Sequence, residues 1–374
     1  MSAPHSLPLL RAREDELSKC AYCPKLCRAT CVVSEVQPRE ALTPWGKMTN
    51  AFDAARTGSV TAERAELAWA CSNCMRCREA CDHRNPVTQT LNDARADYVA
   101  LGQAPAAVQA LLERQDEILE LHSAAVGQLE STPGVRADSS TALLLGCRYA
   151  KVFPDEARAA IRLAARLAGP VRLVSGCCGA WQRAAGAPAA AAAAQKRLAG
   201  ELGHAKRFFV LDPRCALELS AFTPTTLVEL AARHLQRFGP APPRFASLRY
   251  HDSCALGRGL GLYDEPRRLL SRVAGAPPLE LETEREHARC SGGGGVLPVS
   301  MPDVAQAAGQ RLAAEHARLG GGTIVTGCAS SLSQLRRAGA DAVDLITLLE
   351  SALSSTTNYQ LPTANSSSSS SSND

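Results

Sequence analysis

Apolar residues recur at helical spacing in the first third of the chain and in short runs farther along. Leu91, Ala94, Tyr98 and Leu101 share one helical face. From residue 143 the rhythm changes. We expect strands at 143–146, 171–175, 208–211, 248–251 and 323–326, and helices at 156–167, 189–202, 225–237, 265–273, 304–319, 330–338 and 345–353. Strands that alternate with helices predict βαβ units with parallel sheets.

The same change of rhythm, together with composition, divides the chain into segments. We expect a leader at 1–17, a cysteine-rich helical domain at 18–122, a linker at 123–140, two α/β units at 141–245 and 246–353, and a tail at 354–374. The tail contains seven consecutive serines and cannot bury enough apolar surface to fold. It is therefore predicted to be disordered.

The downstream cysteines repeat at a nearly fixed distance. Cys177 and Cys290 lie 113 positions apart, as do Cys215 and Cys328, while Cys147 and Cys254 lie 107 apart. Two copies of one strand–cysteine–helix layout predict a duplicated α/β unit. Ligands of such sheets sit beyond the carboxyl ends of the strands. We therefore expect these cysteines to converge on a site, rather than to pack as ordinary buried thiols.

Composition favours a metal-binding protein of a reducing compartment. The 374 residues include 15 cysteines and carry a net charge of +4. An odd cysteine count in so long a chain does not fit a secreted disulfide scaffold, and no apolar stretch approaches the ~18 residues of a membrane span. The mild positive charge gives no reason to expect a nucleic-acid partner. We expect a cytoplasmic protein whose grouped cysteines bind metal.

The eight N-terminal cysteines form two runs of four. The first run is Cys20, Cys23, Cys27 and Cys31, and the second is Cys71, Cys74, Cys77 and Cys81. In two-cluster ferredoxins, the fourth cysteine of a run binds the cluster held by the other run. This logic predicts one 4Fe–4S cluster on Cys20, Cys23, Cys27 and Cys81, and a second on Cys71, Cys74, Cys77 and Cys31.

Structural zinc is the main alternative for these runs. Zinc sites usually pair two knuckles separated by roughly 12 to 20 residues, whereas here four cysteines crowd into each run. The first run departs from the ferredoxin pattern by one extra residue between Cys23 and Cys27. Farther along, the glycine run 292–295 lacks the frame of a phosphate loop, and we expect it to allow a close backbone approach to a cofactor.

Residues 18–353 resemble a family that joins a two-cluster ferredoxin domain to a pair of cysteine-rich CCG domains. The family includes the iron–sulfur subunit of glycolate oxidase, the iron–sulfur protein of lactate utilisation, the small subunit of anaerobic glycerol-3-phosphate dehydrogenase and the catalytic subunit of heterodisulfide reductase. The resemblance rests on both cysteine runs, on Pro44-Trp45-Gly46 and on Cys177-Cys178-Gly179. It implies an all-helical ferredoxin domain followed by two tandem α/β CCG units.

The resemblance also implies metal ligands in each unit. The first copy keeps Cys147, Cys177, Cys178 and Cys215, the four thiolates of a further cluster, with Asp212 at the place of another family cysteine. The second copy keeps Cys254, Cys290 and Cys328, while Ser291 and Val325 stand where the family has cysteines. For this copy the sequence leaves two alternatives: it holds a cluster with one labile iron, or it holds no cluster.

The function that the resemblance implies is electron transfer within an oxidoreductase complex. A flavin-containing dehydrogenase partner would oxidise a hydroxy acid or a similar substrate. A quinone or a carrier like the electron-transfer flavoprotein would receive the electrons, and any membrane contact would be made through a partner. The sequence has no flavin or nicotinamide fingerprint, so we assign no catalytic residue and do not expect a complete enzyme. The alternatives are a thiol or disulfide reductase acting at the first CCG copy, and a zinc-stabilised interaction protein.

Overall fold

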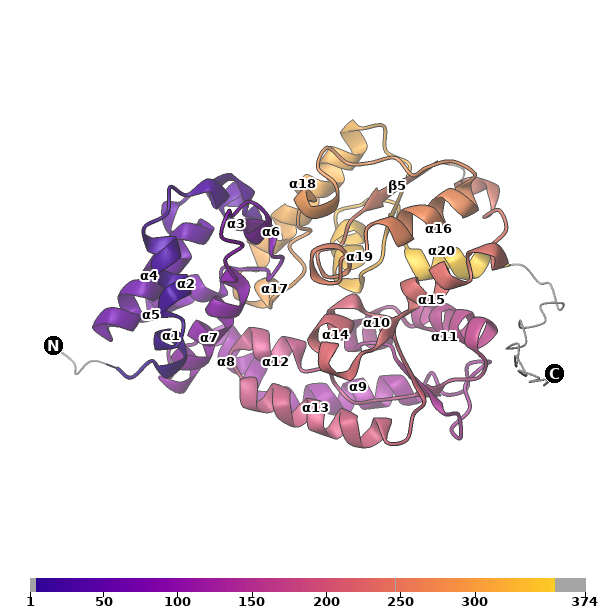
Figure 1. The fold of residues 1–374 in the computed structure, drawn as a ribbon, viewed down its shortest axis with the longest axis horizontal. Helices are drawn as coiled ribbons and strands as arrows, with labels where there is room; N and C mark the ends of the chain where they lie inside the picture. The colour runs from indigo at the N-terminus through magenta and orange to yellow at the C-terminus, as the bar shows by residue number, and fades with distance from the viewer. Residues whose placement is uncertain (1–4, 246, 354–374) are drawn as a thin grey trace, which may run out of the picture.

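The computed structural model describes residues 5–245 and 247–353. A helical N-terminal part lies beside two small α/β units, which stack on each other (Figure 1). Within the described ranges, no helix combines the length and the apolar character needed to cross a membrane.

The chain is helical up to residue 127. The helices are α1 (Pro8–Arg11), α2 (Glu14–Ala21), α3 (Val32–Val36), α4 (Pro44–Thr57), α5 (Ala62–Trp69), α6 (Arg76–Glu79), α7 (Val87–Ala100), α8 (Ala106–Glu113) and α9 (Gln115–Gly127), with 3-10 turns at Leu26–Thr30 and Glu40–Leu42. Pro44 occupies the first turn of α4, and the Thr43 side chain caps it by accepting a hydrogen bond from the Gly46 N–H.

Two boundaries differ from those expected from the sequence. Leu7, Leu10 and Leu17 are fully buried in the core of the helical part, so the described residues of the predicted leader pack as part of that domain. Helix α9 continues to Gly127, inside the predicted linker, and Val126 joins the core of the α/β units. The short apolar run near Leu7 gave no sign of this packing because its partners lie on distant helices.

The first α/β unit is a four-stranded parallel sheet. Its strands are β1 (Thr141–Leu144), β2 (Arg172–Leu173), β3 (Arg207–Val210) and β4 (Thr225–Thr226), in the order β2-β1-β3-β4. Its helices are α10 (Cys147–Val152), α11 (Pro154–Ala168), α12 (Ala180–Ala185), α13 (Pro188–Leu202), α14 (Pro213–Glu218) and α15 (Leu227–Arg233), with 3-10 turns at Ser220–Phe222, Leu235–Arg237 and Pro243–Phe245. The sequence predicts that residues 225 and 226 begin a helix. They form β4, and helix α15 begins only at Leu227, with Thr226 as its N-cap.

The second unit has the same connectivity. Strands β5 (Leu248–His251), β6 (Thr323–Thr326) and β7 (Ala342–Asp344) are parallel, in the order β5-β6-β7, and Leu279 bridges Arg249 on the free side of β5, where β2 stands in the first unit. The helices are α16 (Asp264–Ala274), α17 (Leu297–Ser300), α18 (Pro302–Arg318), α19 (Ala329–Arg337) and α20 (Leu345–Ser351), with a π turn at Ala255–Gly259 and a 3-10 turn at Arg285–His287. The predicted tail, 354–374, lies outside the described residues.

The two units share one hydrophobic core. Helix α11 of the first unit packs on α20, the last helix of the second, and α16 of the second packs on α15, the last helix of the first. Phe238 and Leu353, which follow the last helices, form a bridge across this interface. At its centre the Tyr149 hydroxyl donates a hydrogen bond to Asp344 Oδ2 at 2.6 Å.

The helical part contacts both units. The indole Nε1 of Trp69 donates to the carbonyl of Ala185 in the first unit at 3.2 Å. The carbonyl of Trp69 accepts from Ser300 Oγ in the second unit at 3.1 Å. Trp69 is fully buried, and its two hydrogen bonds connect the helical part to both α/β units.

Candidate metal centre

Five cysteines drawn from both N-terminal runs line one small cavity of about 50 Å³, together with Trp45 and His83. We call Cys20, Cys23, Cys27 and Cys81 site A; the fifth cysteine, Cys77, belongs to a neighbouring group of cysteines. Burial raises the pKa of Cys20 to about 12, and the neighbouring thiols of the site add to the rise. The fourth cysteine of the second run thus lies with the first three of the first run.

Polar hydrogens point at the sulfurs of site A. Asn85 Nδ2 donates to Cys20 Sγ at 3.0 Å, and the Lys25 backbone N–H donates to Cys23 Sγ at 3.3 Å. Lys25 has a left-handed backbone, with φ of 70°, which turns that N–H inward. The Trp45 backbone N–H, at the start of α4, donates to Cys27 and moderates the pKa of about 11 that burial gives this thiol. Such N–H···S bonds stabilise thiolates.

The remaining four N-terminal cysteines form a second, more enclosed group. Site B consists of Cys31, Cys71, Cys74 and Cys77. Cys31 lies close enough to raise the pKa of both Cys71 and Cys77, although burial is the larger cause. Asn73 and Met75 are left-handed, with φ of 56° and 62°, and the Asn73 N–H donates to Cys71 Sγ at 3.4 Å. The loop therefore wraps its amide groups around the sulfurs.

Three buried cations face site B. Lys47 is 2% exposed and its Nζ lies 3.3 Å from Cys31 Sγ. Arg95 is fully buried and donates to the carbonyl of Cys71 at 3.0 Å. Arg258, from the second α/β unit, donates to the carbonyl of Cys74 at 2.7 Å. No spacing in the sequence marks these residues, since each is an isolated cation on a different element.

The first α/β unit gathers four thiols beyond the carboxyl ends of its strands. Site C consists of Cys147 after β1, Cys177 and Cys178 after β2, and Cys215 after β3. The Cys178 thiol hydrogen-bonds with both Cys177 and Cys215, and Cys147 lies close to Cys177. Asp212, at the N-cap of α14, is buried beside them, and its burial raises the pKa of the carboxyl.

The second unit repeats this arrangement with three thiols. Site D consists of Cys254, Cys290 and Cys328, and Cys254 lies close to both others. A glycine with a left-handed backbone lies two residues after a cysteine in each unit and donates its N–H to that cysteine's sulfur. The distance is 3.4 Å from Gly179 to Cys177 and 3.3 Å from Gly292 to Cys290.

The residue that replaces the missing cysteine is engaged elsewhere. The Ser291 hydroxyl lies 3.1 Å from the hydroxyl of Ser331 on α19, and both side chains are buried. Arg214 reaches across from the first unit, with its Nη2 3.5 Å from Cys254 Sγ. Asp212 lies near Cys328, so sites C and D are neighbours.

Sites B and D touch across the domain junction. The thiols of Cys74 and Cys290 hydrogen-bond with each other, and the Ser72 hydroxyl lies 3.2 Å from Cys290 Sγ. The glycine run explains how the backbones come so close. A Cβ at Gly294 would lie 2.6 Å from the Ser72 carbonyl oxygen, and one at Gly295 would lie 2.6 Å from the Ser72 carbonyl carbon. The close approach is thus to the ferredoxin-type loop itself.

Comparison with known families matches two stretches of the chain. A family model described as a 4Fe–4S dicluster domain matches residues 16–85, and one described as a cysteine-rich domain, CCG, matches residues 248–336. The first stretch contains sites A and B, and the second contains site D. The chain contains a 4Fe–4S dicluster domain and a CCG domain. The dicluster domain carries two 4Fe–4S clusters.

Curated proteins that match parts of the chain are oxidoreductases or subunits of oxidoreductases. The chain is 41% identical over 64 residues to one subunit of the dihydromethanophenazine:CoB–CoM heterodisulfide reductase of Methanosarcina barkeri, a stretch that covers 17% of this chain and 16% of the relative. It is 45% identical over 56 residues to EtfAB:quinone oxidoreductase of Syntrophomonas wolfei, covering 15% and 8%. It is 33% identical over 79 residues to one subunit of the fumarate reductase (CoM/CoB) of Methanothermobacter marburgensis, covering 21% and 16%. Each match thus spans only a small part of the relative, and no solved structure matches.

The donor chemistry of the dicluster domain fits iron–sulfur clusters. Each site offers four sulfur donors, and the backbone N–H groups of Lys25 and Asn73 point at sulfur. Burial raises the pKa of Cys20 and Cys71, and metal binding reverses this effect because a coordinated thiol is a thiolate. Arg258 has a buried Nη2 with no hydrogen-bond partner in the described part of the chain, among the thiols of Cys74, Cys254 and Cys290. An anionic cluster would satisfy it.

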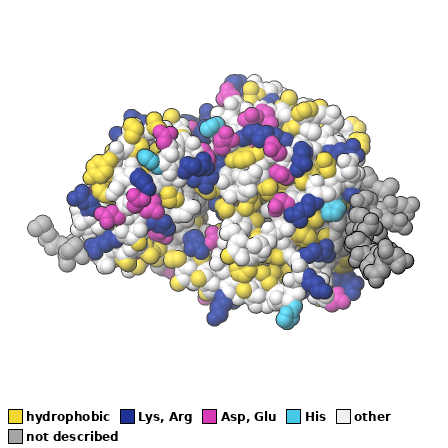
Figure 2. Space-filling model, viewed as in Figure 1, with side chains coloured by type: hydrophobic (Ala, Val, Ile, Leu, Met, Phe, Trp, Pro, Cys, Tyr) yellow, Lys and Arg dark blue, Asp and Glu magenta, His cyan; other side chains and the backbone are white. Residues whose placement is uncertain are grey.

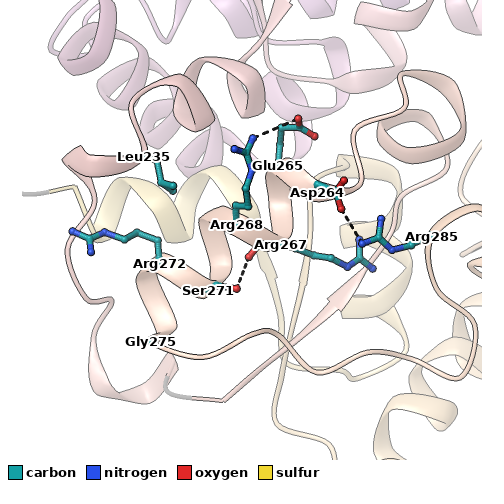
Figure 3. Close-up of a pocket in the computed structure, with 9 residues that line it drawn as sticks. All are labelled: Leu235, Asp264, Glu265, Arg267, Arg268, Ser271, Arg272, Gly275 and Arg285. Carbon is teal, nitrogen blue, oxygen red and sulfur yellow. Dashed lines mark hydrogen bonds and ion pairs between the residues drawn. The ribbon is translucent and has the colours of Figure 1, made fainter.

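A wide basin lies on α16, away from these sites. It has a volume of about 920 Å³ and includes four arginines but no cysteine (Figure 3). Arg267 is paired with Asp252 and Glu280, and Arg285 is paired with Asp264. On the face seen in Figure 2, basic and acidic side chains are interspersed. The basin therefore offers little uncompensated charge to an anionic ligand.

Proposed function

We propose that this protein is the iron–sulfur electron-transfer subunit of an oxidoreductase complex. In this proposal sites A and B are the ligand sets of the two 4Fe–4S clusters, which accept and release single electrons when bound. The observation that carries the proposal is the interlock of the two runs. Cys81 lies in site A and Cys31 in site B, as the crossed ligation of two-cluster ferredoxins requires.

We propose that the first α/β unit, like the second, is a CCG unit, and that the two units arose by duplication. The shared strand order, the bridge at Leu279 and the equivalent N–H···S bonds of Gly179 and Gly292 support this. Site C then holds a further cluster through its four thiolates. Site D, with three thiolates and Ser291, stays the open case. The division into domains at 18–122, 141–245 and 246–353 belongs to the same proposal, with Leu7, Leu10 and Leu17 packed into the first domain and α9 extending that domain to Gly127.

The contacts between sites support a continuous electron route. Site C neighbours site D through Asp212 and Arg214, and site D touches site B through Cys290 and Cys74. Sites B and A share the two interlocked runs. The chain therefore supplies a row of sulfur ligands from the α/β units to the far end of the dicluster domain, with no long gap at the domain junction.

The partners are inferred from this layout. We propose that a flavin-containing dehydrogenase, acting on a hydroxy acid or similar substrate, delivers electrons at the CCG units. Site A is the proposed exit, because Tyr22 and Leu26 on its loop expose 78% and 54% of their surface. A quinone-linked or flavoprotein carrier would dock there. Cytoplasmic location, and any membrane contact through a partner, stay predictions.

Metal analysis of the full chain tests this function. After anaerobic reconstitution we expect about eight irons and eight sulfides per chain from sites A and B, and about twelve when site C is loaded. The reduced sample should give electron paramagnetic resonance (EPR) signals of 4Fe–4S clusters. A colourless protein that contains zinc and no iron would refute the proposal and establish the zinc-stabilised alternative.

A further inference from the structure

We propose that Lys47, Arg95 and Arg258 make site B the first of the two dicluster sites to take up an electron, by giving its cluster a higher reduction potential than that of site A. The inference rests on the proposed function, since it presupposes clusters at both sites. It adds the order in which they fill and the residues that set it.

Lys47 is the most direct of the three cations. It lies on α4 with 2% of its surface exposed, and its only side-chain partner in the described part of the chain is Cys31 Sγ, at 3.3 Å. A lysine so buried would ordinarily be neutralised or paired with a carboxylate. Here its counter-charge is a thiolate ligand of site B.

The two arginines complete a positively charged shell. Arg95 bonds to the backbone carbonyls of Ala68, Cys71 and Ala184 and to the side-chain oxygen of Asn92. In the described part of the chain, the Arg258 side chain bonds to the carbonyls of Cys74, Glu286 and Ala288 and to no carboxylate.

Within residues 5–245 and 247–353, no carboxylate pairs with Lys47, Arg95 or Arg258. Their three charges therefore face the site B thiols uncompensated, in a low-dielectric interior where they are poorly screened.

Site A has a different electrostatic environment. Lys19 lines its cavity, but the side chain is 42% exposed and is paired with Asp15. Lys25 is 37% exposed, pairs with Glu40 and stacks over Trp45. These charges are neutralised by partners and screened by solvent. The polar side-chain contact with a site A sulfur is the neutral amide of Asn85.

The sign of the effect follows from the charge of a cluster. A 4Fe–4S cluster with four thiolates is anionic, and its negative charge grows when it is reduced. A fixed positive charge nearby stabilises the reduced form more than the oxidised form. Uncompensated cations therefore raise the potential, and they do so far more at site B than at site A.

A redox titration of the reconstituted full chain, followed by EPR, tests this order. The wild type should show two one-electron steps in the dicluster domain. Lys47→Met removes the charge while keeping an unbranched side chain of similar length. We expect it to lower the reduction potential of the higher step by at least about 59 mV, which is a tenfold change in the equilibrium constant for one electron. The potential of the lower step should not change.

Two further variants separate charge from packing. Lys47→Arg keeps the charge and should hold the higher step close to its wild-type potential. Lys19→Met removes the exposed, paired cation beside site A and should move neither step. If Lys47→Met fails to load site B, Arg258→Gln removes a second charge beside site B and should lower the same step.

The outcomes are distinguishable. A shift of the lower step in Lys47→Met, no shift of the higher step in Lys47→Met or Arg258→Gln, or an equal shift in Lys19→Met would overturn the inference while leaving the proposed function intact. A chain that binds no iron and gives no EPR signal overturns the proposed function and this inference together.

Discussion

Replacing Gly295 with alanine tests how closely the CCG domain approaches the dicluster domain. The new Cβ would lie 2.6 Å from the carbonyl carbon of Ser72 and 2.7 Å from the carbonyl oxygen of Cys71, so the two backbones would have to separate. Overpacking of this kind costs about 1–3 kcal/mol. Position 295 also has φ of 62°, and a left-handed alanine costs about 1–2 kcal/mol more. We therefore expect the free energy of unfolding to fall by about 2–5 kcal/mol.

Gly261→Ala is the matched control in the same domain. Gly261 has φ of 75°, and no atom lies within 4 Å of the position of its new Cβ, so this variant carries the conformational cost alone. Urea unfolding under argon, followed by far-ultraviolet circular dichroism, should place Gly295→Ala about 1–3 kcal/mol below Gly261→Ala. Equal losses in the two variants would show that the glycine run is not pressed against the dicluster loop, and the contact between sites B and D would lose its support.

Three further predictions address the sites and the interface. Cys81→Ser should remove about four irons per chain by metal analysis, and a full wild-type complement in this variant would contradict the crossed ligation. Burial raises the pKa of Asp344 from 3.8 to about 6 despite the hydrogen bond from Tyr149, so the unfolded carboxyl ionises first and stability falls as pH rises between about 4 and 6. Asp344→Asn should reduce the loss in unfolding free energy between pH 5 and pH 7 by about 1.4 kcal/mol, and an unchanged loss would contradict the raised pKa. Leu26→Ser should slow reduction of a purified flavodoxin by the dithionite-reduced chain several-fold, whereas Val152→Ser, 54% exposed on α10, should not, and equal rates would exclude site A as the exit.

Regular elements with a strong pattern could be predicted from the sequence. Strands β5 and β6 coincide with the apolar runs at Leu248 and Thr323, because each run is fully buried on both faces of a parallel sheet. Strand β4 could not be predicted, since two threonines joined to a helical pattern look like the start of the helix. The spacing of the cysteine runs predicts which thiols lie together, and the fold brings Cys81 beside Cys20.

The environment of the sites carried no comparable signal. Lys47 and Arg258 are single cations on unrelated segments, and their role depends on tertiary contacts that no local pattern encodes. The glycine run did indicate a close backbone approach, but the sequence could not say to what. Its neighbour is the loop at Ser72, more than 200 residues away in the chain. Such a long-range contact is visible only once the domains are docked.

The two α/β units differ in a way that matches their positions. The first unit keeps four thiols, of which Cys178 hydrogen-bonds with Cys177 and Cys215, and it contacts the helical domain through Ala184, Ala185 and the side chain of Arg214. The second unit turns its cysteine loop into the junction, where Cys290 meets Cys74 and the glycines meet Ser72. Bulkier side chains in this loop would push the second unit away from the dicluster domain, because the glycines lie directly against Ser72. Ser291 itself faces away from that contact, because its hydroxyl lies 3.1 Å from that of Ser331 on α19, so it is Cys290, and not the serine beside it, that joins the second unit to the dicluster domain.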